Sequence, residues 1–491
     1  MNQTLSPQDI RTFYQPSKCD RRVWLDSHGV TGAEPDEFAS LLADLGRQHE
    51  DQYLSTLGEY LDIHALPSTQ RINKTIEAIQ NRVNVIYQGE LRCNIPDLNI
   101  DIIGIPDFLI REGDNYIIRD CKLSKHANES DHPEIVYQLE LYGLLFERAI
   151  GHPPARLEVV LGDNTIVQIP YDSSSRSIEQ LHQILSLRNL PEEPYSPVGW
   201  SKCNGCGFRD RCWTSAIEEH DPALIYGVDQ GLAIQLRSLN VHDFRELNEK
   251  FTVESLTDLK RPVGKMMKRV GKSAESILTL AQSMQEKRII QRAPLEVQHS
   301  DYYVMFDLEG VPPYSDDLDL IYLWGLQVFG KQQSNYLPAV APFTDRGEEI
   351  GWKDFLKNAD SIFKKHGDVP FIHWHHYETS KVKAYIEKFG DSNGIAERVL
   401  NNCIDLLPIT RKAFAMPLSS YSLKEVEKLA GYKRTMEEFG GAWSIVQYYR
   451  AKNSNDEKLQ QEVIGTILRY NEEDLQATWS VMQWIKGLAK G

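Results

Sequence analysis

Four cysteines stand at the two ends of the first two hundred residues of this chain. Cys19 lies near the N-terminus, and the other three form a C-x2-C-x5-C run made of Cys203, Cys206 and Cys212. Zinc and iron–sulfur clusters both accept four thiolates, and structural zinc usually draws on two C-x2-4-C pairs. The single close pair favours a [4Fe–4S] cluster, with Zn²⁺ as the alternative. Either centre would tie the two ends of a domain together.

Acidic residues and a lysine gather between the cysteine ends. The segment DIIGIPDFLIREGDNYIIRDCKLSK, residues 101–125, predicts a β-hairpin with strands over 102–110 and 116–123. Asp107 lies on the first strand, while Asp120 and Lys122 project from one face of the second. Two neighbouring carboxylates can hold Mg²⁺ or Mn²⁺, and the lysine adds a positive charge. Such a trio suits metal-assisted attack of water on a phosphodiester.

Two further elements supply candidates for this first centre. The helical segment EIVYQLELYGLLFERA places Gln138 and Tyr142 on one helix face. Upstream, His49 lies on a predicted helix that follows Gly46 in LGRQHEDQYL. We expect His49 to be a further metal ligand.

These residues, in this order, resemble the RecB-like branch of the PD-(D/E)XK nucleases. The closest pattern is that of its iron–sulfur members, which include the CRISPR-adaptation exonucleases and the AddB helicase–nuclease subunit. The resemblance covers roughly residues 1–215 and implies cleavage of single-stranded DNA with Mg²⁺ or Mn²⁺. Cys121 departs from the pattern between the acid and the lysine, and we expect this small side chain to be tolerated.

A second acidic constellation lies in the C-terminal part of the chain. SDYYVMFDLEGVPP predicts a strand on which Asp307 and Glu309 share one face. LRYNEEDLQATWSVMQWI predicts an amphipathic helix with Tyr470 and Asp474 at i and i+4. Facing one another, these groups can bind two divalent ions about 4 Å apart, with Tyr470 orienting a water.

Between them lie a strand and a helix with Glu378 at the junction. This order resembles the DnaQ-like, RNase H-fold exonucleases of the DEDD type with a Tyr-x3-Asp last motif, over roughly residues 298–488. Members usually carry Asn and then Asp in the second motif, where this chain has Trp374, His376, Tyr377 and Glu378. We therefore assign the ligand role to Glu378 and a structural role to Asp405.

The intervening residues 216–297 predict a helical connector. The segment LAIQLRSLNVHDFRELNEKF resembles a helix-hairpin-helix module in which Asn240 replaces the usual glycine, and a plain helical linker is the alternative. A basic run predicts a phosphate-binding surface, or else a solvated helix face. It comprises Lys260, Arg261, Lys265, Lys268, Arg269 and Lys272.

Length and composition indicate a globular α/β protein of several domains. The 491 residues, 41% hydrophobic and 25% charged, suffice for two or three cores. No apolar run approaches the ~18 residues of a membrane helix, so we expect a cytoplasmic protein without membrane association. The net charge of −16 is an average that clustered carboxylates lower, and it does not exclude nucleic acid.

The domains expected are a restriction-endonuclease-like α/β domain over 1–215, the connector over 216–297 and an RNase H-like α/β domain over 298–491. As a whole the chain resembles RecB-family nucleases in which these domains are fused. We expect a metal-dependent exonuclease that acts on DNA, preferring single-strand ends, through two separate centres. An RNA or RNA–DNA hybrid nuclease, and a binding scaffold with one dead centre, are the alternatives. A helicase, or a defence or repair partner, would supply unwound strands.

Overall fold

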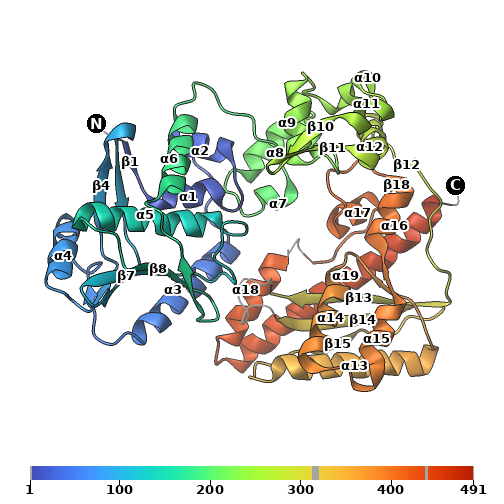
Figure 1. The fold of residues 1–491 in the computed structure, drawn as a ribbon. Helices are drawn as coiled ribbons and strands as arrows, with labels where there is room; N and C mark the ends of the chain where they lie inside the picture. Colours follow the sequence, from blue (N-terminus) through green and yellow to red (C-terminus); the bar gives the residue numbers. More distant parts are fainter. Residues whose placement is uncertain (1–2, 312–319, 437–440, 490–491) are drawn as a thin grey trace. The chain divides into compact units, whose positions relative to one another are not determined.

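The chain divides into two compact units. The computed structural model describes residues 3–311, 320–436 and 441–489 (Figure 1). Among these, the first unit holds 3–196 and 200–212, and the second holds 197–199 and the rest from 213 onward. The connector therefore packs with the C-terminal domain in one unit. No helix in the described ranges is long and apolar enough to cross a bilayer.

A mixed six-stranded sheet forms the base of the first unit. The predicted hairpin is present, with β6 (Phe108–Glu112) antiparallel to β7 (Asn115–Cys121). The predicted first strand over 102–110 is divided, because β5 (Ile100–Gly104) belongs to another sheet and Asp107 immediately precedes β6. The sheet order is β2 (Leu61–Asp62), β3 (Val85–Tyr87), β6, β7, β8 (Arg156–Val160) and β9 (Ile166–Ile169).

The core of this unit is built around helix α5 (Pro133–Ile150), which is buried along most of its length. Proline in its first turn and Gly151 in a left-handed conformation at its end set its limits. The helix packs against β7 and β8 of one sheet and β4 (Leu91–Ile95) and β5 of the other (Figure 1). The remaining elements are β1 (Gln3–Leu5), α1 (Pro7–Tyr14), α2 (Asp20–Ser27), α3 (Glu37–Ser55), α4 (Ser68–Gln80), α6 (Ser175–Arg188), α7 (Trp200–Cys203) and α8 (Arg209–Glu218), which runs into the second unit.

The second unit contains a five-stranded sheet of order β15-β14-β13-β16-β17. Antiparallel pairs join β13 to β14 and β14 to β15, and parallel pairs join β13 to β16 and β16 to β17. The strands are β13 (Tyr302–Gly310), β14 (Ile321–Gly330), β15 (Leu337–Val340), β16 (Phe371–His373) and β17 (Cys403–Asp405). The helices are α13 (Gly347–His366), α14 (Tyr377–Phe389), α15 (Ile395–Asn402), α16 (Leu406–Ala413), α17 (Leu423–Leu429), α18 (Gly441–Lys452) and α19 (Glu457–Leu488).

Alternation along β13 explains how this sheet is covered. Val304, Phe306 and Leu308 join the apolar core that α13 closes. Because side chains alternate along a strand, Asp307 and Glu309 point to the opposite face, where α19 packs on β13 and β14 (Figure 1). The paired acids therefore face the helix that carries the other predicted acid.

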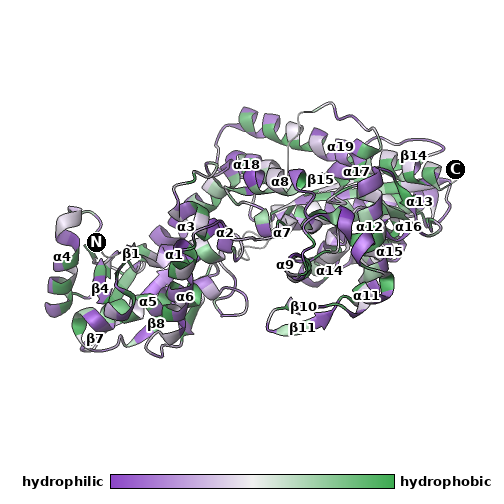
Figure 2. Cartoon of the chain, turned by 90° about the horizontal axis from the view of Figure 1, so that it is seen from above, coloured by the Kyte–Doolittle hydropathy of each residue, from purple (hydrophilic) through white to green (hydrophobic). Residues whose placement is uncertain are grey.

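The connector differs from the helical segment that the sequence predicted. Its helices are α9 (Gln230–Ser238), α10 (Leu247–Lys250), α11 (Val253–Asp258) and α12 (Ala274–Glu286). Residues 260–269 of the basic run form an antiparallel hairpin of β10 (Lys260–Val263) and β11 (Met266–Arg269), and Lys272 follows in a short 3-10 turn, Gly271–Ser273 (Figure 2). Pro262 cannot continue a helix, and Gly264 takes the left-handed turn with φ of 59°. Asn240 also adopts a left-handed φ of 58°, as a hairpin glycine would.

Candidate functional site

Three carboxylates meet between β13 and α19 in the second unit. One oxygen from each of Asp307, Glu309 and Asp474 lies within 4.8 Å of the others. Glu309 and Asp474 are buried, and Asp307 is half-buried. An all-oxygen donor set of this kind suits a hard divalent cation such as Mg²⁺ or Mn²⁺. The structure thus brings together the two acids of the strand and the acid of the helix.

The electrostatics of this triad favour a bound cation. Desolvation, followed by the charges of Asp474 and Glu309, raises the pKa of Asp307 well above its ordinary value. Desolvation and Asp474 raise the pKa of Glu309 to about 8. Burial also raises the pKa of Asp474, although Arg434 acts in the opposite direction. Neighbouring buried carboxylates disfavour their own ionisation, and a divalent cation among them removes that penalty.

Asn471, which the sequence analysis missed, fixes one of these acids. Its Nδ2 donates a 2.6 Å hydrogen bond to Asp307 Oδ2, and its Oδ1 accepts one of 2.7 Å from Tyr336 Oη. The side chain is fully buried against β14, where a Cβ at Gly325 would lie 1.9 Å from Asn471 Oδ1. A polar residue on the apolar face of the predicted helix was the available signal.

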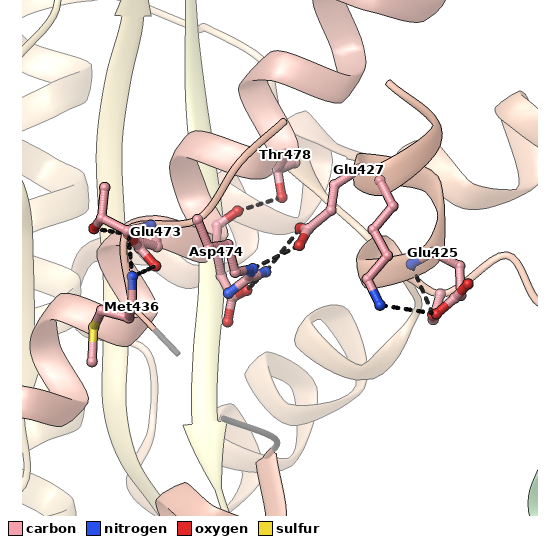
Figure 3. A network of polar contacts seen from close by, with 10 residues as sticks. Glu425, Glu427, Met436, Glu473, Asp474 and Thr478 are labelled. Atoms are coloured by element: carbon pink, nitrogen blue, oxygen red, sulfur yellow. Dashed lines mark hydrogen bonds and ion pairs between the residues drawn. The ribbon is translucent and has the colours of Figure 1, made fainter. Parts of the chain in front are cut away.

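Arg434 is a second residue that the sequence analysis missed. Its guanidinium donates to both carboxylate oxygens of Glu427, at 2.6 and 2.8 Å, and to Asp474 Oδ1 at 2.5 Å. Figure 3 shows Glu427 and Asp474 joined in this network. Nη1 of Arg434 is buried and has no hydrogen-bond partner within the described ranges. A positive charge of the chain therefore stands at the edge of the carboxylate cluster.

Tyr470 and Glu378 both lie near the triad. Burial and the charges of Asp474 and Glu309 raise the pKa of Tyr470, so its phenol stays neutral and able to donate a hydrogen bond. Glu378, in the first turn of α14, is one of the charges that raise the pKa of Asp307. It does not belong to the group whose oxygens approach within 4.8 Å.

The surroundings of Glu378 separate it from Asp405. Glu378 Oε2 is buried 3.4 Å from His373 Nδ1 and makes no hydrogen bond within the described part of the chain. Burial lowers the pKa of His373, but the neighbouring side chains of Cys403 and Glu378 outweigh it and raise that pKa to about 10. Asp405 Oδ1 instead accepts from the backbone N–H groups of His375 and Leu407, both at 3.1 Å, and caps α16. These contacts agree with a structural role for Asp405.

A second cluster forms in the first unit, where β6 begins and β7 ends. The backbone N–H of Asp107 donates to Asp120 Oδ1 at 3.2 Å, and that of Cys121 donates to Asp107 Oδ2 at 2.7 Å. Lys122 Nζ donates to Asp120 Oδ2 at 2.5 Å. The structure therefore joins the three predicted residues in one network.

Charge and burial set the protonation of this cluster. Desolvation and the neighbouring Asp120 raise the pKa of Asp107 well above its ordinary value. Burial lowers the pKa of Lys122, but Asp120 and Asp107 outweigh it, so the net shift is upward and the amine stays charged. Burial and the same two carboxylates raise the pKa of the Cys121 thiol, which therefore stays neutral and small between its neighbours.

The predicted helix residues line this cluster to different extents. Gln138 Nε2 donates to Tyr142 Oη at 2.9 Å, and burial followed by the charges of Asp120 and Asp107 raises the pKa of Tyr142. His49 is buried on α3 with Nε2 3.4 Å from the carbonyl of Val160. In the described ranges His49 joins no group of three ligands within 4.8 Å.

Glu50, the neighbour of His49 on α3, is a third residue that the sequence analysis missed. Its charge contributes to the raised pKa of Asp107. Glu50 Oε1 accepts from Tyr87 Oη at 2.8 Å and from Gln88 Nε2 at 3.0 Å. The only signal in the sequence was an acid directly beside a predicted ligand.

The cysteine-bearing segments lie side by side in the first unit. Ser17 Oγ donates to the carbonyl of Lys202 at 2.9 Å, and Cys19 Sγ lies 3.4 Å from Ser196 Oγ. Arg22 Nη1 is 3.9 Å from Cys206 Sγ. The thiols of Cys19, Cys203, Cys206 and Cys212 are free of disulfides. The two cysteine-bearing segments are therefore in contact, although in the described ranges no three of these thiols lie within 4.8 Å of one another.

The cations of the basic run divide into two groups. Arg261 pairs with Asp229 at 2.7 Å, and Arg269 pairs with Asp258 at 3.1 Å. The other four are exposed, and no acid of the described ranges lies within 4.0 Å of their amines; they are Lys260, Lys265, Lys268 and Lys272.

Comparisons with known proteins separate the two halves of the chain. Residues 12–213 match the family model of the PD-(D/E)XK nuclease superfamily, and residues 304–486 match that of the RNase H superfamily. No curated protein matches. A solved structure described as "Crystal structure of SSO0001" is 17% identical and covers 39% of this chain and 79% of its own. Its TM-score of 0.25 is too low to establish a shared fold.

Both superfamilies typically use Mg²⁺ or Mn²⁺ and act on nucleic acids. Each matched range contains one of the acidic clusters described above. The two domains indicate a nuclease, that is, a phosphodiester hydrolase with a nucleic acid substrate. The chain carries a PD-(D/E)XK nuclease superfamily domain and an RNase H superfamily domain.

Proposed function

We propose that the chain is a metal-dependent exonuclease that degrades single-stranded DNA from its ends, with a separate centre in each domain. The observation that carries this proposal is the triad of Asp307, Glu309 and Asp474, whose oxygens converge within 4.8 Å. A purely structural role does not explain three neighbouring buried carboxylates with raised pKa values. Their mutual repulsion destabilises the fold unless a cation neutralises it.

In the RNase H-like domain, Asp307, Glu309 and Asp474 would hold Mg²⁺ or Mn²⁺, with Glu378 beside them. Such ions stabilise charge on the scissile phosphate and lower the pKa of an attacking water. Asn471 holds Asp307 in one orientation through the 2.6 Å hydrogen bond. Tyr470, a neutral phenol, is suited to orient the water. Nη1 of Arg434 is suited to donate a hydrogen bond to a phosphate oxygen.

In the PD-(D/E)XK domain, Asp107 and Asp120 are the ligand pair. Lys122 remains protonated and places its charge beside Asp120, where it stabilises negative charge on the phosphate. Tyr142 and Gln138 close one side of the cluster. Glu50 supplies a further oxygen near Asp107, and His49 is a ligand candidate on the same helix.

The four cysteines would hold a [4Fe–4S] cluster, with Zn²⁺ as the alternative. Support comes from the joined segments and from the cations around the thiols. Burial lowers the pKa of Lys202, while the neighbouring Cys19 and Cys203 act in the opposite direction. Arg22 reaches Cys206. Positive side chains favour the thiolate form that metals require.

The test is cleavage of end-labelled DNA, RNA and hybrid strands of one sequence in Mn²⁺ and in EDTA. We expect shortening of single-stranded DNA in Mn²⁺ and none in EDTA. Faster cleavage of RNA than of DNA would instead assign RNA processing, because the 2′-hydroxyl distinguishes the polymers. Intact strands under all conditions would leave a binding scaffold.

A further inference from the structure

A cavity lined by positive charges lies in the second unit, and no residue of the carboxylate triad lines it. It has a volume of about 650 Å³ and lies between α12 of the connector and α16 of the RNase H-like domain. Four cationic side chains line it, namely Lys272, Arg292, Arg411 and Lys412, together with the carboxylate of Glu275, and Lys412 also pairs with Glu296 at 2.7 Å. This accumulation of positive charge is unusual in a chain whose net charge is −16.

Arg292 is held at the wall of this cavity. Its backbone N–H donates to the carbonyl of Ala413 at 2.7 Å, and its Nη1 donates to Ser276 Oγ at 2.5 Å. Its Nε is buried and has no hydrogen-bond partner within the described residues. Burial, and secondarily the charge of Arg411, lower the pKa of Arg292. An unpartnered buried donor among like charges indicates that an anion belongs here.

Two tyrosines, Tyr226 and Tyr421, also line the cavity. The guanidinium of Arg411 lies 3.9 Å from the ring centroid of Tyr226, and the rings of Tyr226 and Tyr421 meet edge-on at 5.6 Å. Tyr421 Oη accepts from the backbone N–H of Met416 at 2.7 Å and donates to the carbonyl of Phe414 at 3.3 Å. Cations beside fixed aromatic rings are the combination that binds single-stranded nucleic acid.

The cavity is linked to the second motif of the RNase H-like site by two direct routes. The carbonyl of Tyr421 accepts a 2.9 Å hydrogen bond from Trp374 Nε1, four residues before Glu378. Asp405 caps the start of helix α16 and accepts a hydrogen bond from the backbone of His375, and the last turn of α16 carries Arg411 and Lys412, which line the cavity. From Asp405 to Arg411 the helix rises about 9 Å.

We propose that this cavity binds a backbone phosphate of the nucleic acid strand whose end is cleaved in the RNase H-like site. The inference rests on the proposed function for the identity of the polymer, while the anion site itself follows from the cavity. The contacts available are positive charges, which recognise phosphate rather than base sequence. The cavity would therefore hold the strand without selecting its sequence.

Strand binding in EDTA tests the proposal without requiring cleavage. The variant is Lys272→Gln/Arg411→Gln, and the matched control is Lys357→Gln/Lys365→Gln, which removes two exposed cations from α13. Fluorescence anisotropy with labelled single-stranded DNA should show a Kd about tenfold weaker for the variant and a change of less than twofold for the control. The slope of log Kd against log salt should fall by about 0.7 for each phosphate that the variant no longer neutralises.

Two further arms identify the source of the phosphate. Thermal shifts with inorganic phosphate and with a mononucleotide measure small-anion binding, and Lys272→Gln alone, at an exposed position, guards against misfolding of the double variant. Unchanged strand affinity with lost protection by inorganic phosphate would overturn the strand assignment in favour of a small-anion site. Unchanged behaviour in every arm would overturn the anion site. If the wild type binds the strand but cleaves nothing, and the variant no longer binds it, the phosphate site in the cavity stands and the proposed function is rejected.

Discussion

Asn471 Nδ2 donates to Asp307 Oδ2 at 2.6 Å, and the same amide is held by Tyr336 from its other end. Asp307, the proposed metal ligand on the strand, is thus oriented by a neutral residue of the helix. Replacing a residue that orients a metal ligand typically lowers metal affinity or activity about 10–100-fold.

Replacing Asn471 should therefore weaken the RNase H-like centre without unfolding it. We expect Asn471→Ala to need about tenfold more Mn²⁺ for half-maximal cleavage. Gln461→Ala, at an exposed position of the same helix, is the matched control and should behave as the wild type. An Mn²⁺ titration of cleavage rate makes the comparison. Identical titrations for Asn471→Ala and the wild type would show that the hydrogen bond does not orient a ligand.

The second motif predicts opposite effects at two nearby acids. Glu378→Gln keeps size and hydrogen bonding but removes the charge beside the triad, so its rate should fall as far as that of Asp307→Asn. Asp405→Asn should be mild, because asparagine also caps a helix. Rates on single-stranded DNA decide between them. Severe loss in Asp405→Asn with normal cleavage by Glu378→Gln would move the ligand to Asp405.

The raised pKa of Glu309 predicts how stability of the metal-free protein depends on pH. The pKa of glutamate in an unfolded chain is about 4.3, whereas burial in the folded chain raises the pKa of Glu309 to about 8. Between these values the folded state binds more protons, so the free energy of unfolding falls as pH rises. The melting temperature in EDTA should therefore decrease from about pH 5 to 8.

Glu309→Gln is the control, since an amide does not titrate, and its melting temperature should decrease less over the same range. Mg²⁺ should restore the stability of the wild type at pH 8 more than that of the variant. Equal pH dependence of the melting temperature in the two proteins would contradict the raised pKa of Glu309.

The cysteine centre predicts colour and stability. Protein purified without oxygen should be brown and hold about four irons per chain. Cys19→Ala should lower the melting temperature, because a metal that joins distant segments contributes folding energy. Cys93→Ala, at a buried cysteine outside the set, is the control for loss of packing alone. A colourless protein with one zinc ion would replace the cluster with zinc, and an unchanged melting temperature would remove Cys19 from the centre.

Periodicity explains why so much of both sites was predictable. Residues two apart on a strand and four apart on a helix share a face, and these rules placed Asp307 with Glu309 and Tyr470 with Asp474. Asn471, Arg434 and Glu50 could not be found in this way, because their contacts depend on how separate elements approach. Asn471 in particular requires the space left by Gly325 on a neighbouring strand.

The structure of the connector was not predictable from the sequence in this way. The basic run was expected to be a phosphate-binding surface or else a solvated helix face, and most of it forms a hairpin instead of a helix. Pro262 and Gly264 are strand-edge and turn residues, and the charge pattern concealed their signal. The cavity involving Arg292 and Arg411 joins residues more than a hundred positions apart, and neither stood out locally. Charge clusters assembled by tertiary packing leave no short motif.

The most direct test of the central claim is degradation of end-labelled single-stranded DNA by wild type, Asp120→Asn, Asp307→Asn and the double variant, in Mn²⁺ and in EDTA. Loss of a metal ligand should lower the rate of its own centre at least ~100-fold. Asp114→Asn, in the exposed turn of the same hairpin as Asp120, should cleave normally. We predict that each single variant loses one Mn²⁺-dependent activity and that the double variant loses all cleavage. Mn²⁺-dependent cleavage at the wild-type rate by the double variant would contradict the assignment of both centres.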